Sequence, residues 1–364
     1  MKNLKIIFIL TLIMYANSLY ADGTKALNSL LFGRQPTARA EAMGKSLDLL
    51  TFDPACTFYN PANLGRTEFL TAGGAYASPY YLAEDAFFTN FNTSASLGMI
   101  GAISLNRFDF NLGEKAYVTN LSGEGLDSYD YHETLYTLSY ARPVPGGFYV
   151  GANLNLAQLR LNKTDNAFTA DFGVIKQFNF VKNDLFKYEA AAGISLTNVF
   201  NTSLKYDNLV SDNSLSDKLP SVMRIGLSDR LVYNGVHPLN NLNFLSAILH
   251  IEYFNLINSA INKGYRIGSE LSVLELVYLR AGYFKERVDK SGYPENEKYL
   301  KNFTYGFGVQ LPFQELNIVN IPLKIRFDYT RLEPPSYTTL TKEWDDFTSW
   351  NVNVFLNVDM FKSN

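Results

Sequence analysis

Cysteine is almost absent from this sequence of 364 residues. The single Cys56 cannot form an internal disulfide bond, so the fold is not a disulfide-stabilised scaffold. Charge of one sign is not in excess either, because 32 Lys and Arg stand against 35 Asp and Glu, a net charge of −3 at pH 7. Nucleic-acid binding needs clustered positive charge, and we therefore expect no nucleic-acid partner.

Long hydrophobic runs are missing beyond the N-terminus. The mean hydropathy is −0.08, and no later stretch approaches the roughly 20 apolar residues of a transmembrane helix. At the N-terminus, two lysines precede an apolar run from Ile6 to Tyr15, and small residues allow cleavage after Ser18 or Ala21. This order is typical of a signal peptide, so we expect residues 1–21 to be removed on export.

Catalytic signatures are also missing. The three histidines, His132, His237 and His250, have no neighbours at metal-ligand spacing, and no phosphate-binding loop or nucleophile elbow occurs. We expect no enzyme activity, no metal and no cofactor.

Aromatic residues are abundant, with 24 Tyr and 27 Phe, and many lie in segments where apolar and polar residues alternate. In the segment from Ile321 to Thr330, every second residue is apolar and the residues between them are mostly charged. Alternating segments of about ten residues are the signature of membrane-spanning barrel strands, whose lipid face is apolar and whose inner face is polar. The pattern predicts strands that cross a membrane.

The alternation recurs along the chain from about residue 67. Phe148–Leu156 alternates cleanly and then changes parity near Ala157, which suggests a β-bulge. Ala86–Ser94 and Gly98–Phe110 alternate poorly. Counting these two segments gives about fourteen strands, an even number as bacterial single-chain barrels have. The predicted fold class is all-β, a transmembrane antiparallel β-barrel over residues 67–364, in the outer membrane.

The predicted connections support this fold. The second, fourth and tenth are short, and the third, seventh, eleventh and thirteenth are long and polar; the long ones fall near 111–130, 198–218, 287–299 and 331–348. Every clearly long connection therefore has an odd rank. This is expected when both termini lie in the periplasm, because turns there are short and outer loops are long.

Charged residues share the polar parity of their strands. Since a charge facing lipid costs about 2–4 kcal/mol at the midplane, we expect them to face the lumen. They form a salt-bridge network that fills the bore, or they guide an anionic ligand such as a fatty-acid carboxylate. The lumen-facing candidates are Arg224, Arg230, Glu252, Arg266, Glu270, Arg280, Lys324, Arg326 and Asp328.

Residues 22–66 lack alternation and contain a run of helix formers that ends at Gly44. A wide barrel needs its lumen filled or gated, so we interpret this segment as a plug. The alternative is a periplasmic tail packed beneath the barrel.

Two motifs in this segment carry a family resemblance. TARAEAMG at 37–44 and DPACTFYNPANL at 53–64 resemble the N-terminal signature of the FadL-like outer-membrane barrels, and most closely the PorV/PorQ branch associated with type IX secretion. The resemblance implies fourteen strands and an N-terminal plug. The motif residues that we single out are Arg39, Met43, Gly44, Asp53, Asn60, Pro61 and Ala62.

The resemblance leaves two functions open. The first is a non-enzymatic role in type IX secretion, with machinery subunits or secreted cargo as partners beside outer-membrane lipid. The second is transport of long-chain fatty acids or other hydrophobic small molecules, as in FadL. A bore filled by ion pairs would favour the first, and a continuous apolar pocket behind the plug would favour the second.

Overall fold

A computed structural model describes residues 35–78, 86–111, 113, 116–119, 125–129, 131–161, 163–183, 185–207, 214–235, 242–257, 263–287, 299–332 and 347–357. The predicted signal peptide lies outside these residues. Fourteen antiparallel strands form one closed barrel, which confirms the predicted fold class. They are β1 (Phe69–Ser78), β2 (Phe87–Ser96), β3 (Ala102–Asn111), β6 (Tyr131–Val144), β7 (Phe148–Leu161), β8 (Lys163–Lys182), β9 (Phe186–Leu196), β12 (Val222–Tyr233), β13 (Leu245–Leu256), β14 (Lys263–Val273), β15 (Val277–Arg287), β16 (Tyr299–Pro312), β17 (Leu323–Leu332) and β18 (Phe347–Asn357).

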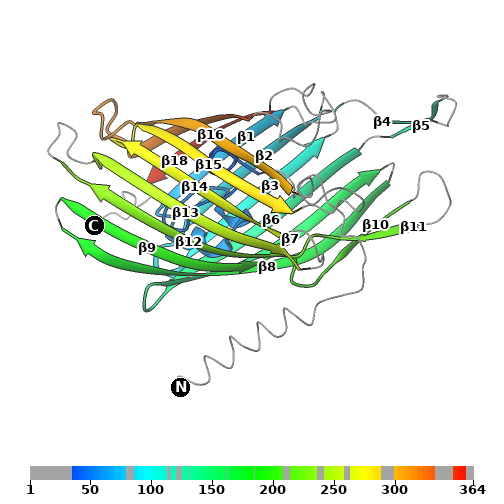
Figure 1. Ribbon diagram of the computed structural model, residues 1–364, viewed down its shortest axis with the longest axis horizontal. Helices are drawn as coiled ribbons and strands as arrows, with labels where there is room; N and C mark the ends of the chain where they lie inside the picture. The colour runs from blue at the N-terminus through cyan, green and yellow to red at the C-terminus, as the bar shows by residue number, and fades with distance from the viewer. Residues whose placement is uncertain are drawn as a thin grey trace, which may run out of the picture.

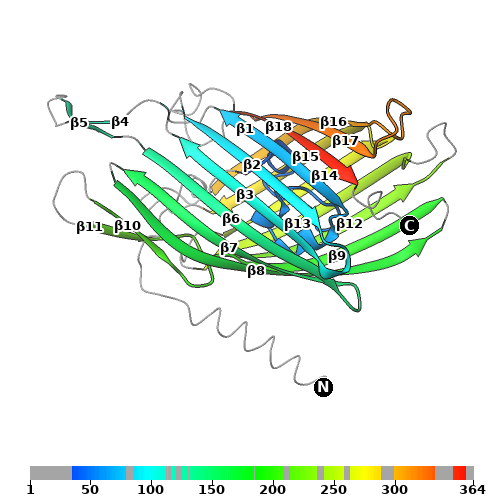
Figure 2. The same ribbon diagram turned by 180° about the vertical axis from the view of Figure 1, so that it is seen from behind.

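The barrel closes where β1 pairs with β18, and every other strand pairs with its neighbours along the chain. Two small ribbons extend from one end, β4 (Ala116–Thr119) with β5 (Gly125–Tyr129) and β10 (Ser203–Asp207) with β11 (Ser214–Lys218) (Figures 1 and 2). Among the described residues, no helix has the length and hydropathy needed to cross a bilayer.

Burial alternates along the strands as the sequence pattern predicts. In β14, all five even-numbered residues are buried and all six odd-numbered residues are exposed. The exposed positions are largely apolar, as Tyr265, Ile267 and Leu271 are, whereas Arg266 and Glu270 point inwards. A closed sheet with an apolar outer face satisfies its backbone hydrogen bonds inside lipid, which is the condition for a barrel to span a membrane.

The connections between strands differ at the two ends of the barrel. The second, fourth and tenth connections, 97–101, 145–147 and 274–276, are short, and the ribbons lie in the third and seventh. The eleventh and thirteenth, 288–298 and 333–346, are long as predicted, but the eighth, 234–244, is as long as the eleventh. The four connections that were predicted to be long therefore have odd ranks. However, the eighth connection is also long, so an odd rank does not identify every long connection.

Residues 35–66, here called the inner segment, lie inside the barrel (Figures 1 and 2). The segment contains the helix α3 (Ala38–Ala42) and two 3-10 turns, η1 (Cys56–Phe58) and η2 (Pro61–Arg66). Thr37 caps α3 through its side chain, and Asn60 caps η2 in the same way. Since α3 contacts β15 to β18 and η2 contacts β6 to β8, the segment spans the bore.

Three details of the predicted strands are wrong. Gly98–Ile100 forms a 3-10 turn, η3, and β3 begins only at Ala102. Strand β17 begins at Leu323 and not at Ile321. No bulge occurs at Ala157, because β7 pairs with β6 and β8 through this position without a change of register. The change of parity there has another cause, which lies in the lining of the bore.

Candidate functional site

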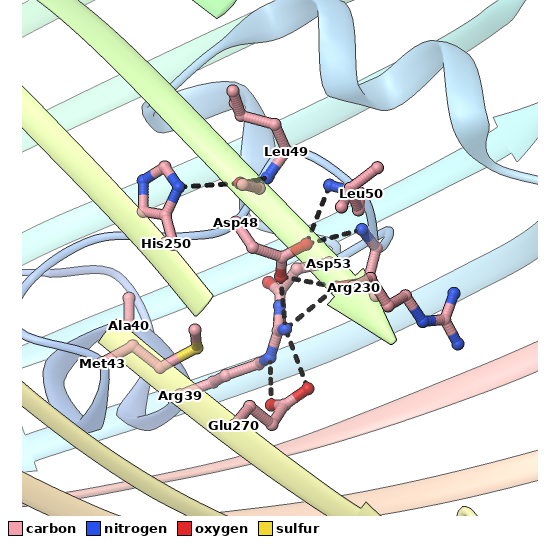
Figure 3. Close-up of polar contacts among 12 residues, drawn as sticks. Arg39, Ala40, Met43, Asp48, Leu49, Leu50, Asp53, Arg230, His250 and Glu270 are labelled. Carbon is pink, nitrogen blue, oxygen red and sulfur yellow. Dashed lines mark hydrogen bonds and ion pairs between the residues drawn. The ribbon is translucent and has the colours of Figure 1, made fainter. Parts of the chain in front are cut away.

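Arg39 is the centre of the polar interior. Its side chain is buried and lies between two carboxylates, with 2.6 Å from Nη2 to Asp48 and 2.8 Å from Nε to Glu270 (Figure 3). Asp48 belongs to the inner segment and Glu270 to β14. Arg39 therefore ties the inner segment both to itself and to the barrel wall.

The ion pairs continue from Glu270 into a closed ring. Glu270 also accepts a hydrogen bond from Arg280 Nε at 2.6 Å, and Arg280 Nη1 lies 2.8 Å from Asp328. Asp328 accepts a hydrogen bond from Arg326 Nε at 3.0 Å, and Arg326 donates to Asp53 at 2.9 Å. Asp53 lies 3.7 Å from Arg39, which closes the ring of six alternating charges. We call these six residues, Arg39, Glu270, Arg280, Asp328, Arg326 and Asp53, the ionic ring.

Asp48 holds the loop beside the ring. Its carboxylate accepts hydrogen bonds from the backbone N–H groups of Leu50 and Thr51 at 2.8 and 2.7 Å. Burial raises the pKa of Asp48, but the Arg39 cation and these hydrogen bonds outweigh burial, and the net pKa lies below its usual value of 3.8. Asp48 is therefore ionised at neutral pH and completes the environment of Arg39.

A second ionic cluster lies beside the ring on β12 to β15. Arg266 donates to Glu286 at 2.9 Å and to Glu252 at 3.3 Å, and it also donates to the backbone oxygen of Lys45 in the inner segment. Arg224 is buried, but its Nε lies 4.0 Å from Glu252, and neither Nε nor Nη1 has a hydrogen-bond partner among the described residues. Arg224 is thus a buried cation with free donors.

The two remaining candidates also face inwards but lie away from the ring. Arg230 donates to Ser246 at 3.2 Å and lies 3.8 Å from Glu189. Lys324 pairs with Glu315 at 3.2 Å near the short-turn end of the barrel. These two residues therefore do not hold the inner segment.

Met43 and Gly44 lie against glycines of the wall. Gly44 has a φ of +69°, which favours glycine, and its N–H donates to Thr304 Oγ1 at 2.8 Å. A Cβ atom on Gly268 of β14 would lie 2.5 Å from the carbonyl oxygen of Met43. The inner segment can approach this wall only because β14 carries a glycine here.

Asn60, Pro61 and Ala62 lie on a second glycine surface, on β7 to β9. A Cβ atom on Gly151 would lie 2.5 Å from the carbonyl carbon of Pro61, and Asn60 Nδ2 donates to the backbone oxygen of Ile194 at 3.2 Å. Five of the seven motif residues therefore lie against glycines of the wall, where no side chain stands between the two backbones. The other two, Arg39 and Asp53, bind charged side chains of the wall.

On β1 to β3, β6 to β8, β17 and β18, the lining of the bore becomes apolar towards the long connections. In this apolar layer, Phe58 of the inner segment packs edge-on against Phe108 of β3, with ring centroids 5.7 Å apart. The layer includes the inward side chains of the strand ends and the base of the β10–β11 ribbon. Its buried members are Ala77, Ala86, Phe88, Phe108, Phe110, Leu135, Ala157, Leu159, Ala167, Leu204, Leu219, Leu332 and Phe347.

The apolar layer explains the parity change in β7. Ala157 and Leu159 point into the bore, like Asn153 and Asn155 below them, while Arg160 is exposed on the outside. At this end of β7 the inner face is apolar and the outer face is polar, the reverse of the pattern lower in the strand. The side chains keep their alternation and only the chemistry of the two faces is exchanged.

One part of the wall is hollowed on both sides. On the lipid side, an apolar recess of about 560 Å³ is lined by exposed side chains of β2 to β8, among them Phe91, Leu138 and Phe168, and by Phe200. On the lumen side, a cavity of about 20 Å³ lies between Phe58, Leu135, Asp171 and Arg224. Both hollows are lined by the same four residues, Asn106, Thr137, Asn155 and Thr169.

These four residues, here called the wall row, are direct neighbours across the sheet. Asn106 of β3 pairs with Thr137 of β6, Thr137 with Asn155 of β7, and Asn155 with Thr169 of β8. A single layer of short polar side chains and backbone therefore separates the lumen from the lipid-side recess.

Several of these residues were not among the sequence candidates. Glu286 shares the inward parity of Arg280 on β15 and could have been found by the same rule. Inward glycines such as Gly151 and Gly268 follow the same parity. Their role in the close approach of the inner segment to the wall is apparent only from the structure. Asp48 lies in a segment without periodicity and had no sequence signal.

Comparisons with known proteins give similarity in structure only. No family model matches the sequence, and no curated protein matches it. A FadL homologue from Pseudomonas aeruginosa is 10% identical, covers 92% of this chain and 100% of its own, and has a TM-score of 0.49. The toluene transporters TbuX from Ralstonia pickettii and TodX from Pseudomonas putida are 13% and 12% identical.

The superposition with TbuX covers 90% of this chain and 98% of TbuX, and the superposition with TodX covers 88% of this chain and 97% of TodX. The TM-score is 0.45 in both cases. At such identities and TM-scores, the likeness does not carry a function over to this chain.

Proposed function

We propose that this barrel takes up small hydrophobic molecules at its long-connection end and releases them sideways into the outer membrane. The observation that carries the proposal is the wall row, since the same four side chains line a lumen cavity and an apolar recess on the lipid side. The apolar layer above it offers hydrophobic molecules a surface on which burial is favourable.

The inner segment acts as a plug in this proposal. The ionic ring and the glycine contacts hold it across the bore below the apolar layer, so a molecule that enters from the long-connection end cannot continue straight to the other side. The thin wall beside Phe58 is then the way out. Arg224, with its free donors at the lumen cavity, allows the solute to carry an acidic group.

An uptake experiment tests the route. Thr169→Phe fills the lumen cavity next to the wall row. Thr348→Phe places the same change on the outward face of β18, at a residue that does not line the recess. With equal amounts of barrel in the membrane, Thr169→Phe should slow entry of a hydrophobic dye into the membrane at least several-fold, whereas Thr348→Phe should not. Equal uptake by both variants would reject the sideways route, and wild-type uptake no faster than in barrel-free vesicles would reject transport.

The ionic ring favours a second function, the one that the PorV/PorQ resemblance implies. We propose as an alternative that the sealed barrel is a non-enzymatic partner of the type IX secretion machinery, which binds its subunits or cargo through the outer connections. The supporting observation is that Arg39 and Asp53, both in the resembling motifs, join the inner segment to the barrel wall by ion pairs. Deletion of the gene should then stop secretion of cargo proteins while uptake of hydrophobic dyes stays unchanged.

A further inference from the structure

The charges on β14 to β17 are sorted between the two faces of the wall. Every acidic residue in these four strands, Glu270, Glu286 and Asp328, points inwards and pairs with an arginine. The charged residues with outward parity are all basic and all lie at strand ends next to the long-connection side. They are Lys263, Lys285, Arg287, Lys301 and Arg331.

Three of these, the lysines, form an outward basic patch to which no residue in the described part of β14 to β17 adds an outward negative charge. Lys285 and Lys301 are directly opposite each other in the pairing of β15 with β16, and Lys263, Lys285 and Lys301 are all exposed. Like charges in directly opposed positions destabilise a sheet. None of the three lysines forms an ion pair with any residue in the described part of the chain, so an external anion would relieve this repulsion.

An aromatic belt lies directly beside the basic patch. Tyr265 is opposite Lys285 in the strand pairing and is 61% exposed. Its ring centroid lies 5.3 Å from that of Tyr253. Phe303 is 73% exposed, and its ring centroid lies 5.0 Å from that of Tyr283. Aromatic girdles mark the boundary between the hydrocarbon and the headgroups. The lysines therefore stand at the level of lipid headgroups on the long-connection side.

The opposite wall of the barrel does not share this feature. On β3, the outward Arg107 is neutralised by Asp109, with 2.8 Å between Nε and Oδ2. The basic patch is thus confined to one side, on strands that do not line the lipid-side recess. Its role is separate from the proposed route of hydrophobic molecules.

We propose that the outward ends of β14, β15 and β16 bind a lipid of the outer leaflet that carries more than one phosphate on its headgroup. Lys263, Lys285 and Lys301 bind the phosphates, and the acyl chains lie along the aromatic belt and the aliphatic side chains below it. A lysine presents a compact charge on a flexible stem and is a common phosphate ligand. Several cations within one patch favour a lipid with several phosphates over a zwitterionic one.

The test is native mass spectrometry of the folded barrel after addition of equal amounts of three lipids. These are phosphatidylcholine, phosphatidylglycerol and a diphosphorylated glucosamine lipid, and affinity should increase in that order. Because each lysine near an anionic lipid contributes about 1 kcal/mol, Lys285→Gln with Lys301→Gln should weaken binding of the diphosphorylated lipid roughly 30-fold. Lys285→Arg with Lys301→Arg should keep it.

The matched control removes the same charge at the other end of the barrel. Arg142 at the end of β6 and Lys182 at the end of β8 are both exposed near short connections. Arg142→Gln with Lys182→Gln should leave the affinity for the diphosphorylated lipid unchanged. Equal affinity for the three lipids, or an equal loss in the control variant, would overturn the proposal; heat-modifiable gel mobility verifies that each variant is folded.

Discussion

The interior of this barrel consists of two regions with opposite chemistry. Around Arg39, six charged side chains form a closed ring that joins the inner segment to β14, β15 and β17. Around Phe108, nearer the long connections, the inner faces of β1 to β3, β6 to β8, β17 and β18 are lined by phenylalanine, leucine and alanine. In the ring, ion pairs join the inner segment to the wall, whereas in the apolar layer the side chains meet by hydrophobic packing.

The position of a residue along its strand therefore matters as much as its parity. In the lower part of β7, the polar side chains face inwards, as in Asn153 and Asn155, and the apolar Leu154 faces lipid. In the upper part, Leu159 faces inwards and Arg160 faces outwards. The exchange occurs where the strand leaves the hydrocarbon, because only there can the outer face be polar without cost.

Breaking the ring should have the largest effect. Arg39→Gln leaves three buried carboxylates, Asp48, Asp53 and Glu270, without their shared cation, and losing one partner of a buried ionic network costs about 3–5 kcal/mol. The reporter is Cys56, the only cysteine of the chain, which is buried and whose pKa is raised by burial. Its reaction with a thiol reagent in the folded barrel should accelerate at least ~100-fold.

The control for this variant is Arg142→Gln, which removes an exposed arginine. It should leave the reaction rate of Cys56 unchanged. If Arg39→Gln also leaves the rate unchanged, the ring does not hold the inner segment.

The apolar layer should respond differently. Phe347→Ala removes a fully buried ring from this layer, and such changes cost about 3 kcal/mol in protein cores. We expect a lower unfolding temperature of the barrel but no acceleration of Cys56 modification below that temperature, because the ionic ring is intact. Acceleration equal to that of Arg39→Gln would mean that the two regions are not independent.

The glycine contacts should have a smaller effect. Gly151→Ala places a methyl group against the backbone of Pro61, and such overpacking costs typically about 1–3 kcal/mol. Gly74→Ala is the matched control, since its nearest neighbour would be 3.7 Å away. We expect a moderate increase of Cys56 reactivity in the first variant only. The close-approach account fails if both variants behave alike.

Acidification should have the smallest effect. Because the pKa of Asp48 is lowered in the folded protein, its stabilising contribution is fully present above its ordinary value of 3.8 and is lost as the pH falls through the lower folded value. With a thiol reagent that reacts in acid, Cys56 should stay protected at pH 5 and become more reactive only below about pH 4. Loss of protection near pH 6 would point to another group.

Much of the architecture could be predicted from the sequence, because alternation encodes which face meets lipid. The closed sheet of fourteen strands follows from this signal. The bulge expected at Ala157 was wrong because a change in the chemistry of both faces looks like a change of register. Asp48 and the glycine contacts could not be predicted, since they depend on how the inner segment crosses the bore.

The most direct test of the account measures ion conductance and uptake of a hydrophobic dye on the same reconstituted barrels. The ionic ring is proposed to seal the bore, and the apolar layer with the wall row is proposed to pass hydrophobic molecules sideways. The account predicts that dye enters the membrane faster than in barrel-free vesicles while no conductance steps occur. Conductance steps without accelerated dye entry would contradict it.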